Sequence, residues 1–466
     1  MSPAASAAAD ILVVGGGFTG CALAAALAKD GRRVLLLEGR VGRNPRFNGE
    51  LIHPPGVDGL AALGLLPALA THAERGVSIE GFAVVADAGS DALCLPYREI
   101  DGSRPDGWAM DHHAMVEALR GDVERRPGVT LRTGARVVDL VREGGRVIGV
   151  KLVDGEELRA PLVLSAEGRF SRLRPLVGIA PESTLLSFSL AVLVEGDVLP
   201  HPGYGHIFLG AWGPILAYPI ADDLRGRTSR VRMVIDLPPD IDAKAAVARV
   251  QGDYAAFVPE PLRGALLTAL AGGLSDTVQL CATHAISTRQ CTTPGFALVG
   301  DAAGCSHPLT ATGMTVCLSD ARILGEEIDR VGALRDESID VALHNFSLRR
   351  YRYARAREIL ADALYEVFRG AEDGTRAIRH GIFRYWAASR RARSASMGLL
   401  SGQDSRLGSF IAEYLRVVGQ STGGVLRGQV NDPSFAGRAR SMSGLVGKSL
   451  EKLKKVARSV RDGSFR

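Results

Sequence analysis

A glycine-rich stretch near the N-terminus places the strongest constraint on how this chain can fold. After Asp10, an apolar run from Ile11 to Val14 ends at the pattern Gly15-x-Gly17-x-x-Gly20, and an alanine- and leucine-rich segment follows. In a strand–turn–helix unit the first glycine permits the tight turn, the second lets the backbone approach a pyrophosphate, and the third allows close packing of helix and strand. The phosphates would lie at the N-terminus of the helix, where free N–H groups and the helix dipole favour anions.

An acidic residue follows where such a unit binds a ribose. Residues 33–37 predict a second strand, and Glu38 comes directly after it, 18 residues beyond Gly20. A carboxylate in this position accepts hydrogen bonds from a ribose diol and disfavours a 2′-phosphate. The three parts in register predict a βαβ unit with a parallel sheet that binds a dinucleotide. They do not distinguish FAD from NAD.

A second stretch does distinguish these cofactors. Gly300-Asp301 follows a predicted buried strand, Phe296–Val299, and Gly313 precedes a segment with helical periodicity. A carboxylate at Asp301 can bind the ribityl hydroxyls of a flavin, and the positive end of a helix that starts near Gly313 would stabilise negative charge on a reduced flavin. The alternative is purely structural, with Asp301 as a helix cap and Gly313 as a loop residue. The order and context of the two stretches favour FAD.

Residues 300–320 resemble a known family. The run Gly300-Asp-Ala-Ala-Gly-Cys-Ser-His-Pro-Leu-Thr-Ala-Thr-Gly-Met-Thr-Val-Cys-Leu-Ser-Asp320 is similar to the second FAD motif of squalene epoxidases, within the aromatic-hydroxylase-like flavoprotein monooxygenases. The run Arg46-Phe-Asn-Gly-Glu-Leu-Ile-His-Pro-Pro-Gly56 resembles that family's Arg-x-x-Gly-Glu-x-x-x-Pro-Gly-Gly segment. Shorter matches follow in the same order, so that the resemblance spans roughly residues 10–415.

The resemblance implies an FAD-dependent monooxygenase that inserts one oxygen atom from O₂ into a large apolar substrate, by epoxidation of an isoprenoid or polyene alkene through a C4a-hydroperoxyflavin. It implies that NADH or NADPH supplies electrons, directly or through a partner reductase. It places Tyr97 beside substrate and flavin as the candidate catalytic residue, with a half-buried core tyrosine as the alternative. The residues expected to line FAD, from the motifs and the resemblance together, are Gly15, Gly17, Phe18, Thr19, Gly20, Glu38, Gly39, Arg46, Gly49, Glu50, Arg120, Val137, Glu167, Gly168, Gly300, Asp301, Pro308, Thr312, Gly313, Met314 and Thr315.

The chain departs from the family's pattern at three points. Glu167-Gly168 stands where the family has Asp-Gly, which moves the charge by one methylene. Ala311-Thr312-Gly313 replaces a run of three glycines and restricts the backbone near the flavin. Ala114 occupies a position near His113 where the family has an arginine, and Arg120 is the candidate substitute.

The order of predicted elements indicates an α/β fold with a discontinuous Rossmann-like FAD-binding domain, an inserted α+β substrate domain and a C-terminal helical region. Segments 128–132, 136–141 and 147–152 are expected to form a β-meander. Apolar strands between 188 and 220, with helices around Leu364, Phe368 and Phe383, are expected to wall an apolar pocket. The expected bounds are residues 8–80, 108–180 and 281–341 for the FAD-binding domain, 81–107 and 181–280 for the substrate domain, 342–437 for the helical region, and 438–466 for a basic amphipathic tail.

Positive charge is concentrated in that tail. The net charge is +5, but nine Lys and Arg residues against two acidic residues after residue 437 give the tail +7 and leave −2 for the rest. Its apolar residues recur on one helix face, so the tail can lie on an anionic membrane surface, with a solvated basic tail as the alternative. They are Leu445, Val446, Leu450, Leu453, Val456 and Val460.

The remaining sequence excludes several classes of partner. No basic-aromatic module predicts nucleic-acid binding, and no apolar run reaches the length of a membrane-spanning helix. The first ten residues lack a signal-peptide pattern, and six cysteines without CxxC spacing predict reduced thiols and no metal site. We therefore expect a cytoplasmic protein, free or peripheral on a membrane.

Three other functions remain open at this point. They are hydroxylation or epoxidation of an aromatic, prenylated secondary metabolite, reduction of a prenyl double bond, and non-catalytic carriage of a prenyl lipid. No acid–base triad is expected, because the flavin carries the chemistry. The intact Gly300-Asp301 pair argues against a carrier.

Overall fold

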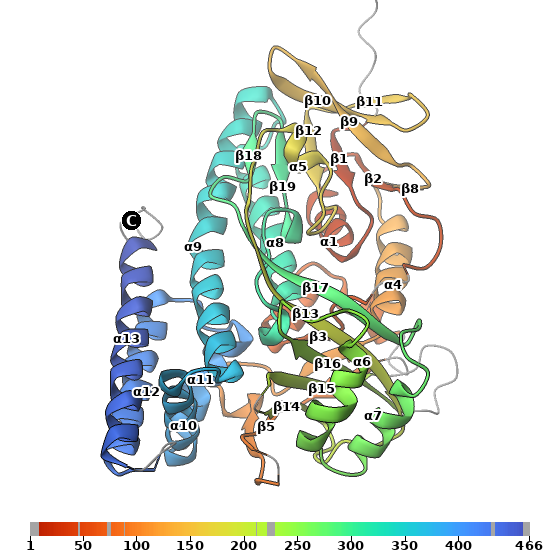
Figure 1. Ribbon diagram of the computed structural model, residues 1–466. Helices are drawn as coiled ribbons and strands as arrows, with labels where there is room; N and C mark the ends of the chain where they lie inside the picture. Colours follow the sequence, from red (N-terminus) through yellow and green to blue (C-terminus); the bar gives the residue numbers. More distant parts are fainter. Residues whose placement is uncertain are drawn as a thin grey trace, which may run out of the picture.

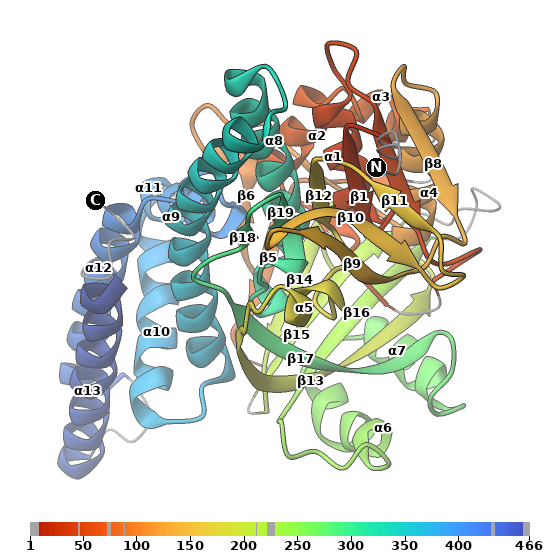
Figure 2. The same ribbon diagram turned by 90° about the horizontal axis from the view of Figure 1, so that it is seen from above.

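The computed structural model describes residues 9–44, 47–71, 76–87, 89–210, 212–220, 229–429 and 434–459. Two large β-sheets lie one beyond the other, and a group of helices stands beside them (Figures 1 and 2). The predicted α/β class and helical C-terminal region are confirmed. The division into domains stays a prediction.

The first sheet is the parallel sheet that the glycine motif predicts. Its strand order is β18-β19-β12-β1-β2-β8, and all neighbours pair in parallel except β18 with β19. All four residues are buried in β1 and in β12, as expected for strands covered on both faces. Its elements and nearby helices are β1 (Ile11–Val14), β2 (Val34–Glu38), β8 (Val129–Thr133), β12 (Leu162–Ser165), β18 (Thr292–Thr293), β19 (Phe296–Leu298), α1 (Phe18–Leu27), α4 (His112–Glu124) and α8 (Gly313–Val331).

The prediction of a β-meander is wrong for the first of its three strands. β8 joins the parallel sheet beside β2, where Val129 and Leu131 pack against the core. Only the two later segments pair antiparallel, in a separate sheet of β9 (Val137–Glu143), β10 (Arg146–Leu152) and β11 (Glu157–Arg159). Burial of the apolar residues of β8 beside β2 outweighs pairing with its neighbour in sequence.

The second large sheet separates two apolar regions. Residues alternate between its faces, so that Phe208 and Met233 face α6 (Ala246–Arg249) and α7 (Leu262–Leu270), whereas Ile207 and Val234 face the opposite side. The order is β17-β13-β16-β15-β14-β5-β6. The strands are β5 (Gly81–Val85), β6 (Leu93–Pro96), β13 (Glu182–Glu195), β14 (Tyr204–Leu209), β15 (Pro214–Ile220), β16 (Arg230–Leu237) and β17 (Val278–Ser287).

Helix α9 (Asp336–Arg369) connects the two sheets. It packs against α8 and β18 near the first sheet and reaches the helical region beside the second (Figure 1). There α10 (Asp373–Ala388), α11 (Arg390–Ser401), α12 (Leu407–Leu426) and α13 (Phe435–Ser459) follow. No helix in the described ranges is both long and apolar enough to cross a membrane.

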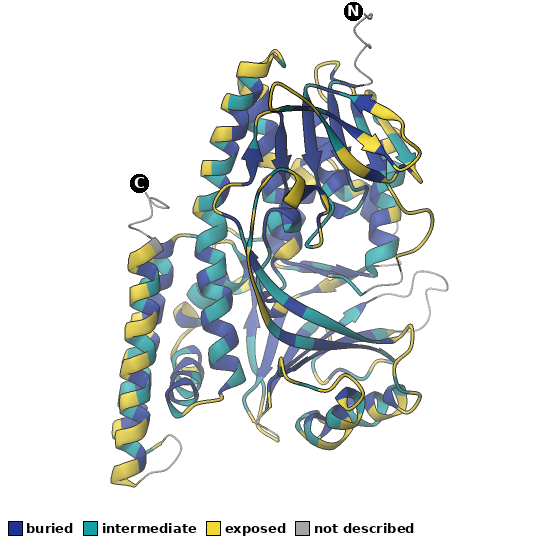
Figure 3. Cartoon of the chain, turned by 45° about the horizontal axis from the view of Figure 1, so that its top comes forward, coloured by how far each residue is buried: buried dark blue, intermediate teal, exposed yellow. Residues whose placement is uncertain are grey.

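An apolar cluster fills the space between the second sheet and these helices, and we call it the apolar layer. Its members include Leu364 and Phe368, and Phe383 packs against it, so the residues expected to wall a pocket lie together, while the pocket itself stays a prediction. In Figure 3 the sheet is largely buried, whereas α13 is exposed along its outer side. Other members are Leu51, Ile79, Phe82, Tyr97, Ile207, Leu209, Leu216, Tyr218, Val234, Leu309, Ile378, Ile382, Trp386 and Met397.

Candidate functional site

The turn between β1 and α1 has the geometry that the glycine motif predicts. Gly15 has φ +106°, and a Cβ there would lie 2.5 Å from the carbonyl oxygen of Ala166. A Cβ at Gly20 would lie 1.9 Å from the carbonyl oxygen of Gly15. A Cβ at Gly17, in contrast, meets no atom within 4 Å. The first and third glycines therefore permit packing, and the second borders open space at the helix N-terminus, where a phosphate fits.

Glu38 lies at this turn, as the ribose-binding role requires. Its Oε2 accepts hydrogen bonds from the Gly16 N–H and from Arg120 Nη2, both at 3.0 Å. Arg120, on α4, also donates from Nε to the Gly16 carbonyl at 2.6 Å. Gly39 follows the carboxylate, and Val137 is buried where β9 begins. The predicted residues for the adenosine end of FAD thus lie close together.

The second stretch meets the first at the same edge of the sheet. Because β1, β12 and β19 are parallel neighbours, their carboxyl ends lie side by side. A Cβ at Gly300 would lie 2.7 Å from Thr19 Oγ1 and 3.0 Å from Cys317 Sγ. The turn after β19 therefore contacts α1 directly, and the two predicted parts of the site form one location.

A buried carboxylate fixes the Gly300 turn. Asp320 is fully buried and accepts hydrogen bonds from the Gly300 N–H at 2.8 Å and from Arg350 Nε at 3.0 Å. Tyr353 donates a third hydrogen bond. Burial raises the pKa of Asp301, next along the chain, and in the described structure no side chain donates to its carboxylate. Asp320 thus holds the turn and leaves Asp301 available for ribityl hydroxyls.

The N-terminus of α8 has the character of an anion site. Thr312 precedes the helix without a side-chain capping bond, and a Cβ at Gly313 meets nothing within 4 Å. Thr315 Oγ1 is buried beside Gly56, 2.8 Å from where a Cβ at that glycine would lie, and so does not border this open space. Uncapped N–H groups beside open space fit the pyrimidine end of a flavin. The residues present therefore fit FAD at both ends.

The departure at the three-glycine run has a visible conformational cost. Ala311 adopts the left-handed conformation, with φ 49° and ψ 24°. A non-glycine residue pays about 1 kcal/mol in this region, which glycine enters freely. The chain therefore holds strain in the loop that borders the flavin site.

An ion pair forms the wall of the groove toward the second sheet. Glu50 accepts hydrogen bonds from Arg232 Nε at 2.8 Å and Nη2 at 2.9 Å, and from the Tyr218 hydroxyl at 3.4 Å. Burial raises the pKa of Glu50, and the guanidinium of Arg232 opposes that rise. The same guanidinium lies 5.0 Å from the centre of the Phe47 ring. Removing one partner of a buried pair such as this costs about 3–5 kcal/mol, so it holds the segment that leads into β3 (Leu51–Ile52) against β16 of the second sheet.

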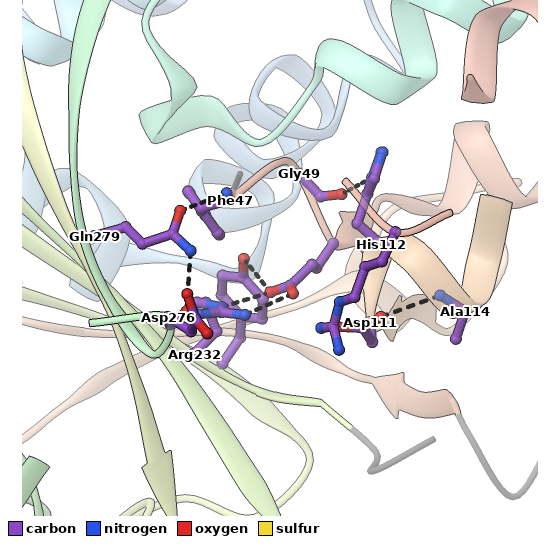
Figure 4. Close-up of polar contacts among 11 residues, drawn as sticks. Phe47, Gly49, Asp111, His112, Ala114, Arg232, Asp276 and Gln279 are labelled. Atoms are coloured by element: carbon purple, nitrogen blue, oxygen red, sulfur yellow. Dashed lines mark hydrogen bonds and ion pairs between the residues drawn. The ribbon is translucent and has the colours of Figure 1, made fainter. Parts of the chain in front are cut away.

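The groove itself extends from Gly17 to this wall. Phe47 N–H donates to Gln279 Oε1 at 2.8 Å, and His112 Nδ1–H donates to the Gly49 carbonyl at 2.7 Å (Figure 4). A Cβ at Gly49 would lie 3.7 Å from Met314 Cε, which brings the wall close to the second stretch. The lining residues are Gly17, Glu38, Arg40, Gly42, Arg43, Asn44, Phe47, Asn48, Glu50, Asp111, His112, His113, Val116, Arg120, Arg232, Asp276 and Gln279.

Tyr97 is connected through His53 to the loop that precedes α8, residues 307–312, which we call the flavin loop. Tyr97 lies in the short helix η2 (Tyr97–Glu99), and its hydroxyl is 2.6 Å from His53 Nδ1. His53 Nε2 is 2.8 Å from the carbonyl oxygen of Thr310. Because a carbonyl only accepts, Nε2 carries the proton and Nδ1 accepts from Tyr97. Burial lowers the pKa of His53 to about 4, so the ring is neutral near pH 7.

His307 makes a second link between the flavin loop and the second sheet. Its Nδ1 accepts from the Leu309 N–H at 3.2 Å, and its Nε2 lies 3.0 Å from Asp236 Oδ1 and 3.2 Å from Ser187 Oγ. A hydrolytic triad needs the serine and the carboxylate on opposite ring nitrogens. Here both are on Nε2, so the cluster positions the loop.

Two predicted residues have a different status. Arg46 lies outside the described residues. Glu167 Oε2 accepts hydrogen bonds from the Ser165 and Ser171 hydroxyls and the Leu173 N–H, so this oxygen is turned into its own loop. The other predicted residues lie around the carboxyl ends of β1, β2, β12 and β19, except Tyr97, Glu50 and Pro308, which lie toward the second sheet. Their contact with FAD remains a prediction.

Sequence reasoning missed His53, Arg232 and Tyr218 as parts of the site. One signal was present for Arg232, since it and Asp236 lie four apart in β16, which is apolar apart from these two and Arg230 at its start, and therefore share a face. Charged residues on a buried face require partners. No spacing rule pointed to Glu50 as that partner.

Comparisons with known proteins agree with this geometry. A family model described as squalene epoxidase matches residues 159–429, and one described as FAD dependent oxidoreductase matches residues 10–91. Squalene epoxidase 3 of Arabidopsis thaliana is 32% identical over 419 residues, which cover 88% of this chain and 77% of that protein. Squalene epoxidase erg1 of Schizosaccharomyces pombe is 30% identical over 425 residues, covering 88% and 89%.

A solved structure supports the fold. That of PqsL, a probable FAD-dependent monooxygenase from Pseudomonas aeruginosa, superposes with a TM-score of 0.64 at 23% identity and covers 84% of this chain and 99% of its own. With the two glycine stretches meeting at one sheet edge, the fold, the site and the matching families define an FAD-dependent monooxygenase. The chain belongs to the squalene epoxidase family.

The lowered pKa of His53 predicts an acid-sensitive step in stability. His53 has a pKa of about 4 when folded against 6.5 in an unfolded chain, so its contribution is present above pH 6.5 and is lost as the pH falls toward 4. At pH 5 this amounts to about 2 kcal/mol relative to pH 8. His53→Gln keeps one donor and one acceptor without titrating. Between pH 8 and pH 5, the melting temperature of the His53→Gln variant should fall several degrees less than the melting temperature of the wild type.

The exposed His344→Gln serves as the matched control and should follow the wild type. Differential scanning calorimetry across this range measures both variants. An equal fall in all three proteins would contradict the neutral, buried state of His53.

Proposed function

We propose that this monooxygenase epoxidises a carbon–carbon double bond of a large isoprenoid or polyene. The observation that carries the proposal is the position of the apolar layer. It begins at Tyr97 and Leu309, directly beside the flavin loop, and continues between the second sheet and α9–α11. FAD, when bound, supplies the oxygen-transfer chemistry, and an apolar environment next to it suits an alkene and excludes water.

The chain's own residues orient the reactants. The Tyr97 hydroxyl donates its hydrogen bond to His53, so its oxygen can only accept from a further neighbour, and its ring lies in the apolar layer. His53 binds the loop at the Thr310 carbonyl, and His307 joins the loop to Asp236 of the second sheet. The substrate and the flavin loop are therefore kept in a fixed relative position. Holding the reactants in this way increases the reaction rate.

Electrons reach the site from NADH or NADPH, and we propose that either the nicotinamide itself or a partner reductase delivers them. Glu167 is tied into its own loop, where the family's aspartate stands, which favours the partner. Anaerobic bleaching of the flavin by NADH or NADPH alone would show direct transfer. Bleaching only after a reductase is added supports the partner.

The function is tested by incubating the FAD-loaded enzyme with reductant and isotopically labelled O₂. Squalene and a prenylated aromatic compound serve as substrates, and mass spectrometry follows the products. We expect one labelled oxygen in an epoxide of the alkene. Label on the aromatic ring would instead support aromatic hydroxylation, and gain of two hydrogens without label would support a reductase. Bound lipid with no product of any kind would indicate a carrier.

Tyr97→Phe removes the hydroxyl and keeps the ring. Loss of one oriented hydrogen bond is expected to lower the rate of product formation about tenfold, with the flavin spectrum unchanged. Tyr351→Phe, on α9 and outside the apolar layer, is the matched control. Equal rates for both variants would remove Tyr97 from the proposed machinery.

We also propose that the helical region rests on an anionic membrane surface through the outer face of α13. Phe435, Val446 and Leu450 are exposed and spaced by 11 and 4 residues, which places them on one side of the helix. The predicted apolar stripe is divided, because Leu445 and Val456 are buried against the protein. Val460 lies outside the described residues. An exposed apolar stripe on a basic helix suits the membrane interface.

Part of the positive charge is also used internally. Lys452 pairs with Asp362 at 2.7 Å and Glu366 at 3.0 Å, and Lys455 pairs with Asp362 at 2.8 Å. The apolar stripe is therefore the better target for mutation than the lysines. The triple variant Phe435→Ser/Val446→Ser/Leu450→Ser should lose about tenfold or more in co-sedimentation with phosphatidylserine-containing liposomes.

The double variant Val341→Ser/Leu348→Ser serves as the control, since these residues are equally exposed on α9. It should sediment like the wild type. Unchanged sedimentation of the triple variant, or no sedimentation of the wild type, would end the membrane proposal.

A further inference from the structure

Arg357 lies on the face of α9 that borders the apolar layer. Leu360, Leu364 and Phe368 follow it at spacings of three and four residues, which places all four on one side of the helix. Leu364 and Phe368 belong to the apolar layer, and Leu360 packs against it. A guanidinium therefore continues an otherwise apolar stripe.

Its hydrogen-bonding capacity is largely unused. Arg357 Nη2 donates to the carbonyl of Gly402, at the C-terminus of α11, at 3.2 Å. Its Nε and Nη1 are buried and have no partner in the part of the chain that the structure describes. Its guanidinium lies 5.7 Å from the centre of the Tyr353 ring, and within the same ranges it forms no ion pair. The carboxylate whose charge it feels, Asp320, is already bound by Arg350. Burial lowers the pKa of Arg357 to about 10, and the charge of Asp320 only partly opposes this effect.

This guanidinium lies near the flavin side of the layer. Its charge helps to lower the pKa of His53, and α9 contacts the short helix Pro308–Thr310 of the flavin loop. His53 in turn holds Tyr97. Arg357 therefore borders the part of the apolar layer where Tyr97, His53 and Thr310 meet.

A second unpaired donor lies in the same layer. Trp386, on α10, is 2% exposed, and its indole N–H has no partner among the described residues. A buried donor left unpaired costs about 1–3 kcal/mol, and replacing a buried charge with an apolar side chain is often neutral or stabilising. Capping of α11 uses one of the five N–H groups of Arg357. A bound ligand that accepts hydrogen bonds would give the unused donors of Arg357 a partner.

We propose that Arg357 is a specificity-determining residue and that the preferred substrate is an isoprenoid carrying a carboxylate or carbonyl oxygen, which this guanidinium binds. The inference rests on the proposed function and narrows its substrate class. A bare hydrocarbon leaves the donor unpaired, and sites built to hydrogen-bond a substrate group reject analogues that lack it. An oxygenated isoprenoid is accordingly oxidised in preference to squalene.

The experiment compares geranylgeranoic acid with squalene in the FAD-loaded full chain. Product formation gives kcat/KM, and quenching of flavin fluorescence gives binding. The wild type should prefer the acid by roughly 100-fold. Arg357→Met, of similar length, should lose about 100-fold on the acid and nothing on squalene, and Arg357→Lys should recover part of that loss. Arg391→Met, exposed on α11, is the matched control and should behave as the wild type.

A wild type that oxidises squalene as well as the acid would overturn the inference and leave the proposed function standing. So would an Arg357→Met protein that melts at a lower temperature but keeps the wild-type preference, because Arg357 would then serve only as the cap of α11. If the acid binds in an Arg357-dependent manner while no substrate gives an oxygenated product, the acceptor site stands and the proposed epoxidation fails.

Discussion

The contact between the Gly300 turn and helix α1 is the constraint on which the rest of this structure depends. Only a residue without a side chain fits there, because Thr19 Oγ1 and Cys317 Sγ leave no room for a Cβ. The contact is possible because β12 lies between β1 and β19 and all three strands run in parallel. It brings the N-termini of α1 and α8 to one edge of the sheet. The two helix ends can therefore bind the pyrophosphate and the flavin ring of a single cofactor molecule.

Three polar links then fix the substrate side relative to this edge. Glu50 with Arg232, His53 with Tyr97, and His307 with Asp236 each join the flavin-side segments to the second sheet or to η2 beside it. Buried polar pairs of this kind add little net stability compared with apolar packing. Their contribution here is to fix the substrate side relative to the flavin side, which a reaction between a bound flavin and an apolar alkene requires.

Much of the fold and half of the site could be predicted from sequence because their rules are local. The spacing of Gly15, Gly17 and Gly20 determines a turn within six residues, and Glu38 follows by the length of one helix and one strand. The pairing of β8 could not be predicted in this way, because it depends on burial beside β2, about ninety residues away. The partners of Glu50 and Tyr97 could not be predicted from the sequence for the same reason. The tail's apolar pattern was visible, but Asp362, which binds two of its lysines, lies on another helix.

The most direct test of the central claim compares FAD with ADP as ligands of the apoprotein, using isothermal titration calorimetry. ADP reaches only the first glycine stretch, whereas FAD must reach both. Gly313→Val fills the open space at the start of α8 without meeting a neighbour within 4 Å at its Cβ. The account predicts that this variant binds FAD at least tenfold more weakly and binds ADP as the wild type does. Unchanged FAD affinity would show that the second stretch does not hold the flavin, and would contradict the account.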